Sequence, residues 1–284
     1  MKLVTYRLAN QEFVGALSAD ETAIHTLPFP DMNALIQGTT IATLPALLAD
    51  APTVSMADVE ILSPIPCPLA DAICLGMNYL DHAKEAAAFN HQSFDRDAMI
   101  PVYFSKRATR TVDPTGIIPR HAGLVQQLDY EAELAVILGK DAFNVAEEDV
   151  ADYIFGYSVA NDVSARVLQT KHKQFYFGKS LDGYFPMGPC ILTADSVPYP
   201  PELAISSKVN GELRQNSNTN QLMTTISQLV ANLSRGMTLK AGTIFLTGTP
   251  AGVGMGFHPP KFLEVGDVVE CAIESIGTIC NTVK

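Results

Sequence analysis

The chain has 284 residues, of which 47% are hydrophobic and 17% are charged, so it can bury a large core and lacks the composition of a disordered protein. Its net charge of −11 is spread without runs of like charge. This argues against nucleic-acid binding, because neutralising phosphates requires clustered Lys and Arg. We therefore expect one large globular domain or two unequal ones.

The cysteines are odd in number and form no Cys-x-x-Cys pair, which is typical of reduced thiols in a cytoplasmic protein and not of a disulfide framework. The first residues, MKLVTYRLANQEFVGAL, alternate and carry polar side chains throughout, unlike a signal peptide. No window approaches about 18 uncharged apolar residues, so we expect no membrane partner.

Residues 1–64 are expected to form a small N-terminal domain of short strands and helical turns. The stretches KLVTYRL and EFVGALS are typical of a hairpin pair, and MNALIQG and ATLPALLAD are typical of helices or turns. The prolines of ILSPIPCP then indicate a linker.

Residues 65–284 are expected to form a mostly β catalytic domain. Short apolar runs (AICLGM, ELAVILG, IFGYSVAND, TIFLTG and DVVECAIE) are separated by Gly, Pro and Asn turns. Only YLDHAKEAAAFN, VSARVLQTKH and TTISQLVANLSRGM have helical character. Many strands with few helices favour an α+β fold that is mostly β, built as a sandwich or a rolled mixed sheet.

Two glutamates in the strand-like stretch LDYEAELAVILGK, Glu131 and Glu133, lie one pleat apart on the same face. Solvated acids on an exposed strand face would explain them equally well. A third acid, Asp162, ends the run GYSVAND, where it or Asn161 could instead cap the following helix. Three carboxylates without an intervening Cys or His suit a hard cation such as Mg²⁺, Mn²⁺ or Ca²⁺, whose charge would offset their mutual repulsion.

A histidine and a glutamate in MNYLDHAKEA, His82 and Glu85, are three residues apart on a predicted helix and therefore share one face. A carboxylate beside a histidine fixes its tautomer and raises its basicity, which suits a general base acting on water. The alternative is an ordinary ion pair on a surface helix.

Lys179 lies in the aromatic, glycine-rich stretch FYFGKSLDGYFPMGP, where its ammonium could face a developing oxyanion, although a loop lysine is usually a solvated charge. In TIFLTGTPAGVGMG, the backbone N–H groups of Thr249 and the following glycines could hold a carboxylate. The GVGMG stretch is not a nucleotide-binding fingerprint, because Pro259 and Pro260 discourage the helix that such a loop requires.

Several motifs in order closely resemble the fumarylacetoacetate hydrolase family from about residue 66 to the C-terminus: GMNYLDHAKE, DYEAELAVILGK, GYSVANDVSAR, GKSLDGYFPMGP, VNGELRQNSNT and LTGTPAGVGMG. The resemblance implies a β-rich catalytic domain, a homodimer and a divalent metal, usually Mg²⁺ or Mn²⁺. It implies that the metal ligands are Glu131, Glu133 and Asp162. It implies catalytic roles for His82, Glu85 and Lys179, and substrate contacts for Thr249, Gly248 and Tyr79.

The chain departs from the family pattern at two positions. Val167 stands where many relatives have an acid after the S-A-R sequence, and Cys190 stands where an aromatic residue is frequent. Neither position belongs to the implied metal site.

Together these residues predict a divalent-metal-dependent hydrolase that cleaves a C–C bond in a 2,4-dioxo acid, an acylpyruvate-like compound or a diketo-deoxy sugar acid. His82, oriented by Glu85, would activate a water that attacks the C4 carbonyl, and Lys179 would stabilise the developing oxyanion. Breaking the C3–C4 bond would leave a pyruvate enolate that the metal stabilises as a Lewis acid. The alternatives are an oxaloacetate decarboxylase, a 2-oxo acid isomerase, and a non-catalytic metal-binding protein that has kept only the fold.

The stretch AAAFNHQSFDRDAMIP, residues 86–101, directly follows the His–Glu pair, and we predict that it forms a lid over bound substrate. An ordinary surface helix and loop is the alternative. No motif reports the walls of the pocket, so the C4 substituent of the substrate stays open.

Overall fold

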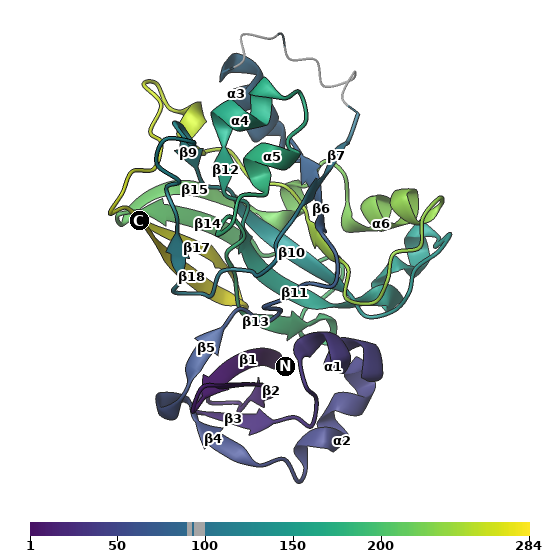
Figure 1. Ribbon diagram of the computed structural model, residues 1–284. Coiled ribbons are helices and arrows are strands. Elements are labelled where there is room, and N and C mark those ends of the chain that lie inside the picture. The colour runs from purple at the N-terminus through teal and green to yellow at the C-terminus, as the bar shows by residue number, and fades with distance from the viewer. Residues whose placement is uncertain (90–92, 94–99) are drawn as a thin grey trace.

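The computed structural model describes residues 1–89, 93 and 100–284 (Figure 1). The strands are β1 Lys2–Leu8, β2 Gln11–Leu17, β3 Ala23–Thr26, β4 Thr53–Ser55, β5 Glu60–Leu62, β6 Ala72–Gly76, β7 Val102–Lys106, β8 Ile117–Ile118, β9 Leu128–Asp129, β10 Ala132–Leu138, β11 Ile154–Asn161, β12 Ser164–Ala165, β13 Met187–Thr193, β14 Ala204–Val209, β15 Glu212–Asn218, β16 Ile244–Leu246, β17 Val268–Ile273 and β18 Gly277–Val283. The α-helices are α1 Met32–Gly38, α2 Leu44–Leu48, α3 Leu80–Phe89, α4 Arg166–Lys171, α5 Tyr176–Lys179 and α6 Ile226–Ser234. The 3-10 helices are η1 Ile41–Thr43, η2 Met56–Asp58, η3 Glu147–Tyr153, η4 Ala194–Ser196, η5 Thr219–Gln221 and η6 Gly254–Gly256.

Most of these strands join one mixed sheet in the order β4-β3-β2-β1-β13-β11-β10-β16-β6-β7, with β5 also pairing β1. A second sheet has the order β15-β14-β17-β18-β8, and β9 pairs with β12 in a short ladder of its own. The expected α+β, mostly β fold with mixed sheets is confirmed, and the sheets do not close into a barrel.

The first two strands, β1 and β2, form the predicted hairpin. β1 and β2 pair antiparallel, and the turn between them places Ala9 and Asn10 at φ values of 48° and 64°, the backbone that a tight two-residue hairpin requires. The side chain of Asp31 caps α1 by accepting a hydrogen bond from the N–H of Ala34 at 2.8 Å. β1 also pairs with β13, so the main sheet runs from the N-terminal strands into the rest of the chain.

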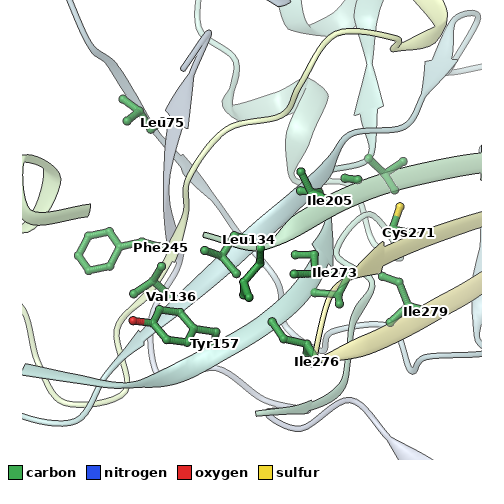
Figure 2. Close-up of a cluster of buried hydrophobic side chains, with 14 of the residues drawn as sticks. Leu75, Leu134, Val136, Tyr157, Ile205, Phe245, Cys271, Ile273, Ile276 and Ile279 are labelled. Carbon is green, nitrogen blue, oxygen red and sulfur yellow. The ribbon is translucent and has the colours of Figure 1, made fainter. Parts of the chain in front are cut away.

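β10 lies inside the main sheet, between β11 and β16. Every one of its residues is buried, so both faces of the strand are covered and neither is solvated. One face packs on the five-stranded sheet, where Leu134 and Val136, with Tyr157 of the neighbouring strand β11, share a buried cluster with Ile205 and Ile273 (Figure 2). The apolar runs of the sequence thus form the interior of two packed sheets, as in other sandwich folds.

The helices α3, α4 and α5 gather at one end of the molecule, next to β9 and β12 (Figure 1). α3 ends at Phe89, so most of the predicted lid lies outside the described residues, because 90–92 and 94–99 are not described. The cysteines are all free. Within the described chain, no helix has the length and apolarity needed to cross a membrane.

Candidate metal centre and active site

Three predicted acids converge at the ends of neighbouring strands. Glu131 directly precedes β10, Glu133 lies within it, and Asp162 follows β11, which pairs with β10 so that Ala132 faces Asn161. One carboxylate oxygen from each acid lies within 4.8 Å of the others. Their exposed fractions are 5%, 2% and 0%, so the solvated-face alternative is wrong. Ala165 occupies the N-cap position of α4, which leaves Asp162 without the helix-capping role considered above.

Two buried lysines pair with these acids. The Nζ atom of Lys179 lies 2.7 Å from Oε2 of Glu131 and 2.6 Å from Oδ2 of Asp162. The Nζ atom of Lys106 lies 2.7 Å from Oδ1 of Asp162. Burial lowers the pKa of Lys179, but attraction to Asp162 and Glu131 outweighs it and raises the pKa to about 12. Lys179 is therefore a permanently charged group within the site at neutral pH, not a solvated loop lysine.

Arg166, at the start of α4, holds Glu131 from another side. Its Nη1 atom donates to Oε1 of Glu131 at 2.6 Å, and its Nε atom donates to Oδ2 of Asp129 at 2.9 Å. Burial raises the pKa of Glu131, but Lys179 and Arg166 lower it by more. The pKa of Glu131 is therefore well below its ordinary value. Glu131 is therefore ionised and fixed in place.

Sequence reasoning missed Lys106, Asp129 and Arg166 as parts of this site. Asp129 carried a signal, because Asp129, Glu131 and Glu133 alternate along one strand-like stretch. Arg166 ends the motif GYSVANDVSAR, in which only Asp162 was assigned to the site. Lys106 ends an apolar strand, and only the pairing of that strand with β6 brings it to Asp162.

The donor set fits a hard divalent cation. Glu133 has no ion pair among the described residues, and the N–H of Gly248 donates to its Oε2 at 2.7 Å. Burial, together with repulsion from Asp162 and Glu131, raises the pKa of Glu133 well above its ordinary value. A cation would offset that repulsion. A carboxylate has about four acceptor positions, so Glu131 can bind a cation and keep its present partners.

His82 and Glu85 lie close together on α3 but do not form a hydrogen bond. The Nδ1 atom of His82 is 3.5 Å from Oε2 of Glu85 and has no hydrogen-bond partner in residues 1–89, 93 and 100–284. Both oxygens of Glu85 instead accept from the N–H of Gly252, at 3.0 and 3.1 Å. His82 is 4% exposed, so the surface ion pair considered above does not describe it.

The glycine-rich turn after β16 holds carboxylates, and these belong to the protein itself. Its N–H groups donate to Glu133 from Gly248, to Glu85 from Gly252, and to Asp129 from Gly254 and Met255. Gly252 has a φ of +103°, and a Cβ atom there would lie 1.9 Å from the carbonyl oxygen of Arg214, so only glycine fits. The turn therefore links α3, β9 and β10 through backbone donors.

Two of the predicted substrate contacts, Thr249 and Tyr79, differ in their hydrogen bonding. Thr249 donates its hydroxyl hydrogen to the carbonyl of Ala132 at 2.9 Å and accepts from Nε2 of Gln215 at 2.7 Å. The hydroxyl of Tyr79 is buried and has no partner in the described part of the chain.

One cavity brings His82, Glu131, Lys179 and Thr249 together. Glu133, Asp162, Glu85, Gly248 and Tyr79 are not among its lining residues. Its polar lining also includes Arg166, Gln169 and Thr170, and its apolar lining includes Met77, Ala86, Phe89, Phe104, Phe175 and Met255. The cavity thus joins a charged end, which could bind an anion and a cation, to a largely apolar wall.

Comparison with known proteins identifies the family. The model for the fumarylacetoacetate (FAA) hydrolase C-terminal domain matches residues 71–284. An oxaloacetate tautomerase, YisK of Bacillus subtilis (strain 168), is 37% identical over 308 aligned positions that cover all of both chains.

Solved structures agree. A fumarylacetoacetate hydrolase from psychrophilic Exiguobacterium antarcticum matches with a TM-score of 0.86 and 37% identity, covering 100% of this chain and 99% of the other. A 5-carboxymethyl-2-hydroxymuconate delta-isomerase from Mycobacterium smegmatis matches with a TM-score of 0.78 and 29% identity at the same coverage. This chain is a member of the fumarylacetoacetate hydrolase family.

Proposed function

We propose that this protein is a divalent-metal-dependent enzyme that interconverts the keto and enol forms of a small 2-oxo diacid of the oxaloacetate type. The observation that carries the proposal is a cluster of three buried acids whose member Glu131 lines one cavity together with Lys179 and His82. Further support comes from the Bacillus subtilis relative, whose name is oxaloacetate tautomerase and whose full length aligns with this chain.

Glu131, Glu133 and Asp162 would hold the cation. Mg²⁺ or Mn²⁺ suits such oxygen ligands and keeps positions open for substrate, and Ca²⁺ is a further candidate. When bound, the cation supplies Lewis acidity and a template for the oxygen atoms of a 2-oxo acid.

His82 is the proposed proton carrier. In the keto-to-enol direction, His82 takes one proton from C3, the electron pair of that C–H bond moves onto the C2 oxygen, and His82 returns the proton to that oxygen to give the enol. The reaction consumes no water and breaks no C–C bond. It therefore needs only an acid–base group and stabilisation of the C2 oxygen.

Lys179 supplies part of that stabilisation. Its ammonium pairs with Glu131 and Asp162, so we assign it the role of a cation and not of the base. Its ammonium lies beside Glu131 and Asp162 on the cavity lining, where it attracts negative charge that develops on the substrate. Phe104, whose ring centroid is 5.3 Å from Nζ, and Phe175 limit the access of water there.

A second candidate is the hydrolysis of a C–C bond in a 2,4-dioxo acid, and the position of Glu85 favours it. Shortening the 3.5 Å distance between Glu85 and His82 by roughly 0.5 Å would give a hydrogen bond that orients the imidazole as a base toward water. In that reaction His82 takes a proton from water, and the hydroxide adds to C4. The C3–C4 bond then breaks to release a carboxylic acid and pyruvate.

One pair of assays separates these reactions. Freshly dissolved enol oxaloacetate is mixed with the protein and Mg²⁺ or Mn²⁺, and both the ultraviolet absorbance of the enol and the release of pyruvate are followed. We expect the enol to decay faster than with the cation alone and without pyruvate release. Acetylpyruvate tests the second candidate through pyruvate release.

Other results of these two assays would identify a different reaction or contradict the proposal. Pyruvate release from oxaloacetate would identify a decarboxylase instead. His82→Ala should abolish the acceleration, whereas His172→Ala, an exposed histidine at the C-terminal end of α4, should not. Turnover of neither substrate with either metal would contradict the proposal.

A further inference from the structure

Asp129 is a fully buried carboxylate that has no part in the cation site or in the proposed proton transfer. Its Oδ1 atom accepts from the N–H of Tyr130 at 2.9 Å and of Gly254 at 2.7 Å. Its Oδ2 atom accepts from the N–H of Met255 at 3.0 Å and from Nε of Arg166 at 2.9 Å. With four donors on its two oxygen atoms, the side chain of Asp129 is held in one orientation.

These partners belong to two separate parts of the cavity wall. Arg166 begins α4, Met255 lies in η6, and both line the cavity. β9, which contains Asp129, pairs with β12 just before α4, and its Leu128 bridges Leu263 just after the glycine-rich turn. Asp129 therefore ties the α4 wall to the turn.

Two nitrogen atoms of the Arg166 guanidinium, Nε and Nη1, are hydrogen-bonded, and the third, Nη2, is not. Nε donates to Asp129, and Nη1 donates to Glu131 at 2.6 Å and to Oε1 of Gln169 at 3.1 Å. Nη2 is buried and has no hydrogen-bond partner within the described residues. A buried guanidinium nitrogen without an acceptor is costly, and a carboxylate in the cavity that Arg166 lines would supply one.

We infer that Asp129 is a positioning residue that fixes Arg166 and Met255 in the cavity wall, so that Nη2 of Arg166 is presented to a carboxylate group of the substrate. The substrate class rests on the proposed function. Asp129 touches no reacting atom and acts through Arg166. Its contribution lies in the binding of the anion, not in the binding of the cation.

The test measures binding and does not depend on turnover. Oxalate, a dicarboxylate without a reactive C–H bond, is titrated calorimetrically into protein saturated with Mn²⁺, and Mn²⁺ affinity is measured separately. The variants are Asp129→Asn, Arg166→Gln and the double variant. Asp141→Asn is the matched control, because Asp141 also accepts from a backbone N–H and a cationic side chain but is exposed and belongs to no cavity wall described here.

We expect Asp129→Asn to weaken oxalate binding by about 10- to 100-fold, the loss that corresponds to one hydrogen bond between charged groups, with Mn²⁺ affinity within about threefold of wild type. Because Asp129 acts through Arg166, the double variant should bind oxalate no more weakly than Arg166→Gln alone. If Asp129→Asn does not fold, Arg166→Lys replaces it, since lysine keeps the positive charge but cannot both donate to Asp129 and present a separate nitrogen to the substrate, so oxalate binding should weaken to a similar extent.

Three outcomes would overturn the inference: oxalate affinity of Asp129→Asn within twofold of wild type, additive losses in the double variant, or an equal loss of Mn²⁺ affinity. Wild-type protein that binds Mn²⁺ but not oxalate would overturn the proposed substrate class and the inference with it. Wild-type binding with an unaffected variant would overturn the role of Asp129 alone.

Discussion

Replacing Lys179 with methionine removes the charge that two of the acids share, while keeping an unbranched chain of similar length. The Nζ atom lies 2.7 Å from Glu131 and 2.6 Å from Asp162, and Lys179 is 2% exposed. Without it, Lys106 still pairs with Asp162 and Arg166 still pairs with Glu131. We therefore expect a protein that folds but is markedly less stable in the absence of a divalent cation.

The size of the effect follows from the burial of the pair. Removing one partner of a buried ion pair typically costs about 3–5 kcal/mol, and we expect the lower end of that range because Lys106 and Arg166 still compensate part of the charge on Asp162 and Glu131. At roughly 2–4 °C per kcal/mol for a chain of this size, the melting temperature of the metal-free Lys179→Met variant should fall by about 10 °C. A cation bound by the same acids would restore part of that loss, so Mn²⁺ should raise the melting temperature of the variant by more than that of the wild type.

Thermal unfolding with EDTA and with saturating Mn²⁺ checks this prediction. Lys240→Met is the control, because Lys240 forms an exposed pair with Asp141, and such pairs contribute less than about 1 kcal/mol. An equal Mn²⁺ effect on wild type and Lys179→Met would refute the reasoning that lysine and cation interact with the same carboxylates.

Three further predictions follow from single side chains. Burial and repulsion from Asp162 and Glu131 raise the pKa of Glu133 well above its ordinary value and so favour its neutral form. Glu133→Gln keeps an acceptor for the Gly248 N–H, so the metal-free protein should be about as stable as wild type, and thermal unfolding should show no Mn²⁺ effect. His82→Ala should lower kcat by about 10²- to 10⁴-fold in steady-state kinetics, and calorimetry should show unchanged Mn²⁺ affinity. Gly252→Ala forces a φ of +103° on alanine and a clash with a carbonyl, so urea unfolding should reveal a loss of more than about 1–3 kcal/mol, whereas Gly236→Ala, with open space around its Cβ position, should change little.

The central strands could be predicted because each is a short apolar run. The predicted runs correspond to β6, β10, β11 and β16 of the main sheet and to β17 of the second sheet. The hairpin of β14 and β15 was missed because its residues are polar and alternate only partly, although Asn210 and Gly211 at its turn adopt φ values of 52° and 79°, a backbone that an Asn-Gly pair favours. The β9–β12 ladder has only two residues per strand, too few for any local pattern.

The acids of the site could be predicted because hard-cation ligands form a recognisable set of residue types. Of the cations around them, Lys179 was named as a catalytic candidate but not as a partner of the acids, and Lys106 and Arg166 were not named. Lys179 ends a four-residue helix and Lys106 ends an apolar strand, so neither local sequence reports that the side chain is buried. Whether a lysine pairs with an acid depends on the pairing of distant strands, which no spacing along the chain encodes.

Diffraction from crystals grown with Mn²⁺, using the anomalous signal of the metal, tests the central claim most directly. The account predicts one strong peak per chain at coordination distance from oxygen atoms of Glu131, Glu133 and Asp162, with Lys179 still beside it. A map without a peak at these acids, with the ammonium of Lys179 as their sole shared cation in the presence of Mn²⁺, would contradict it.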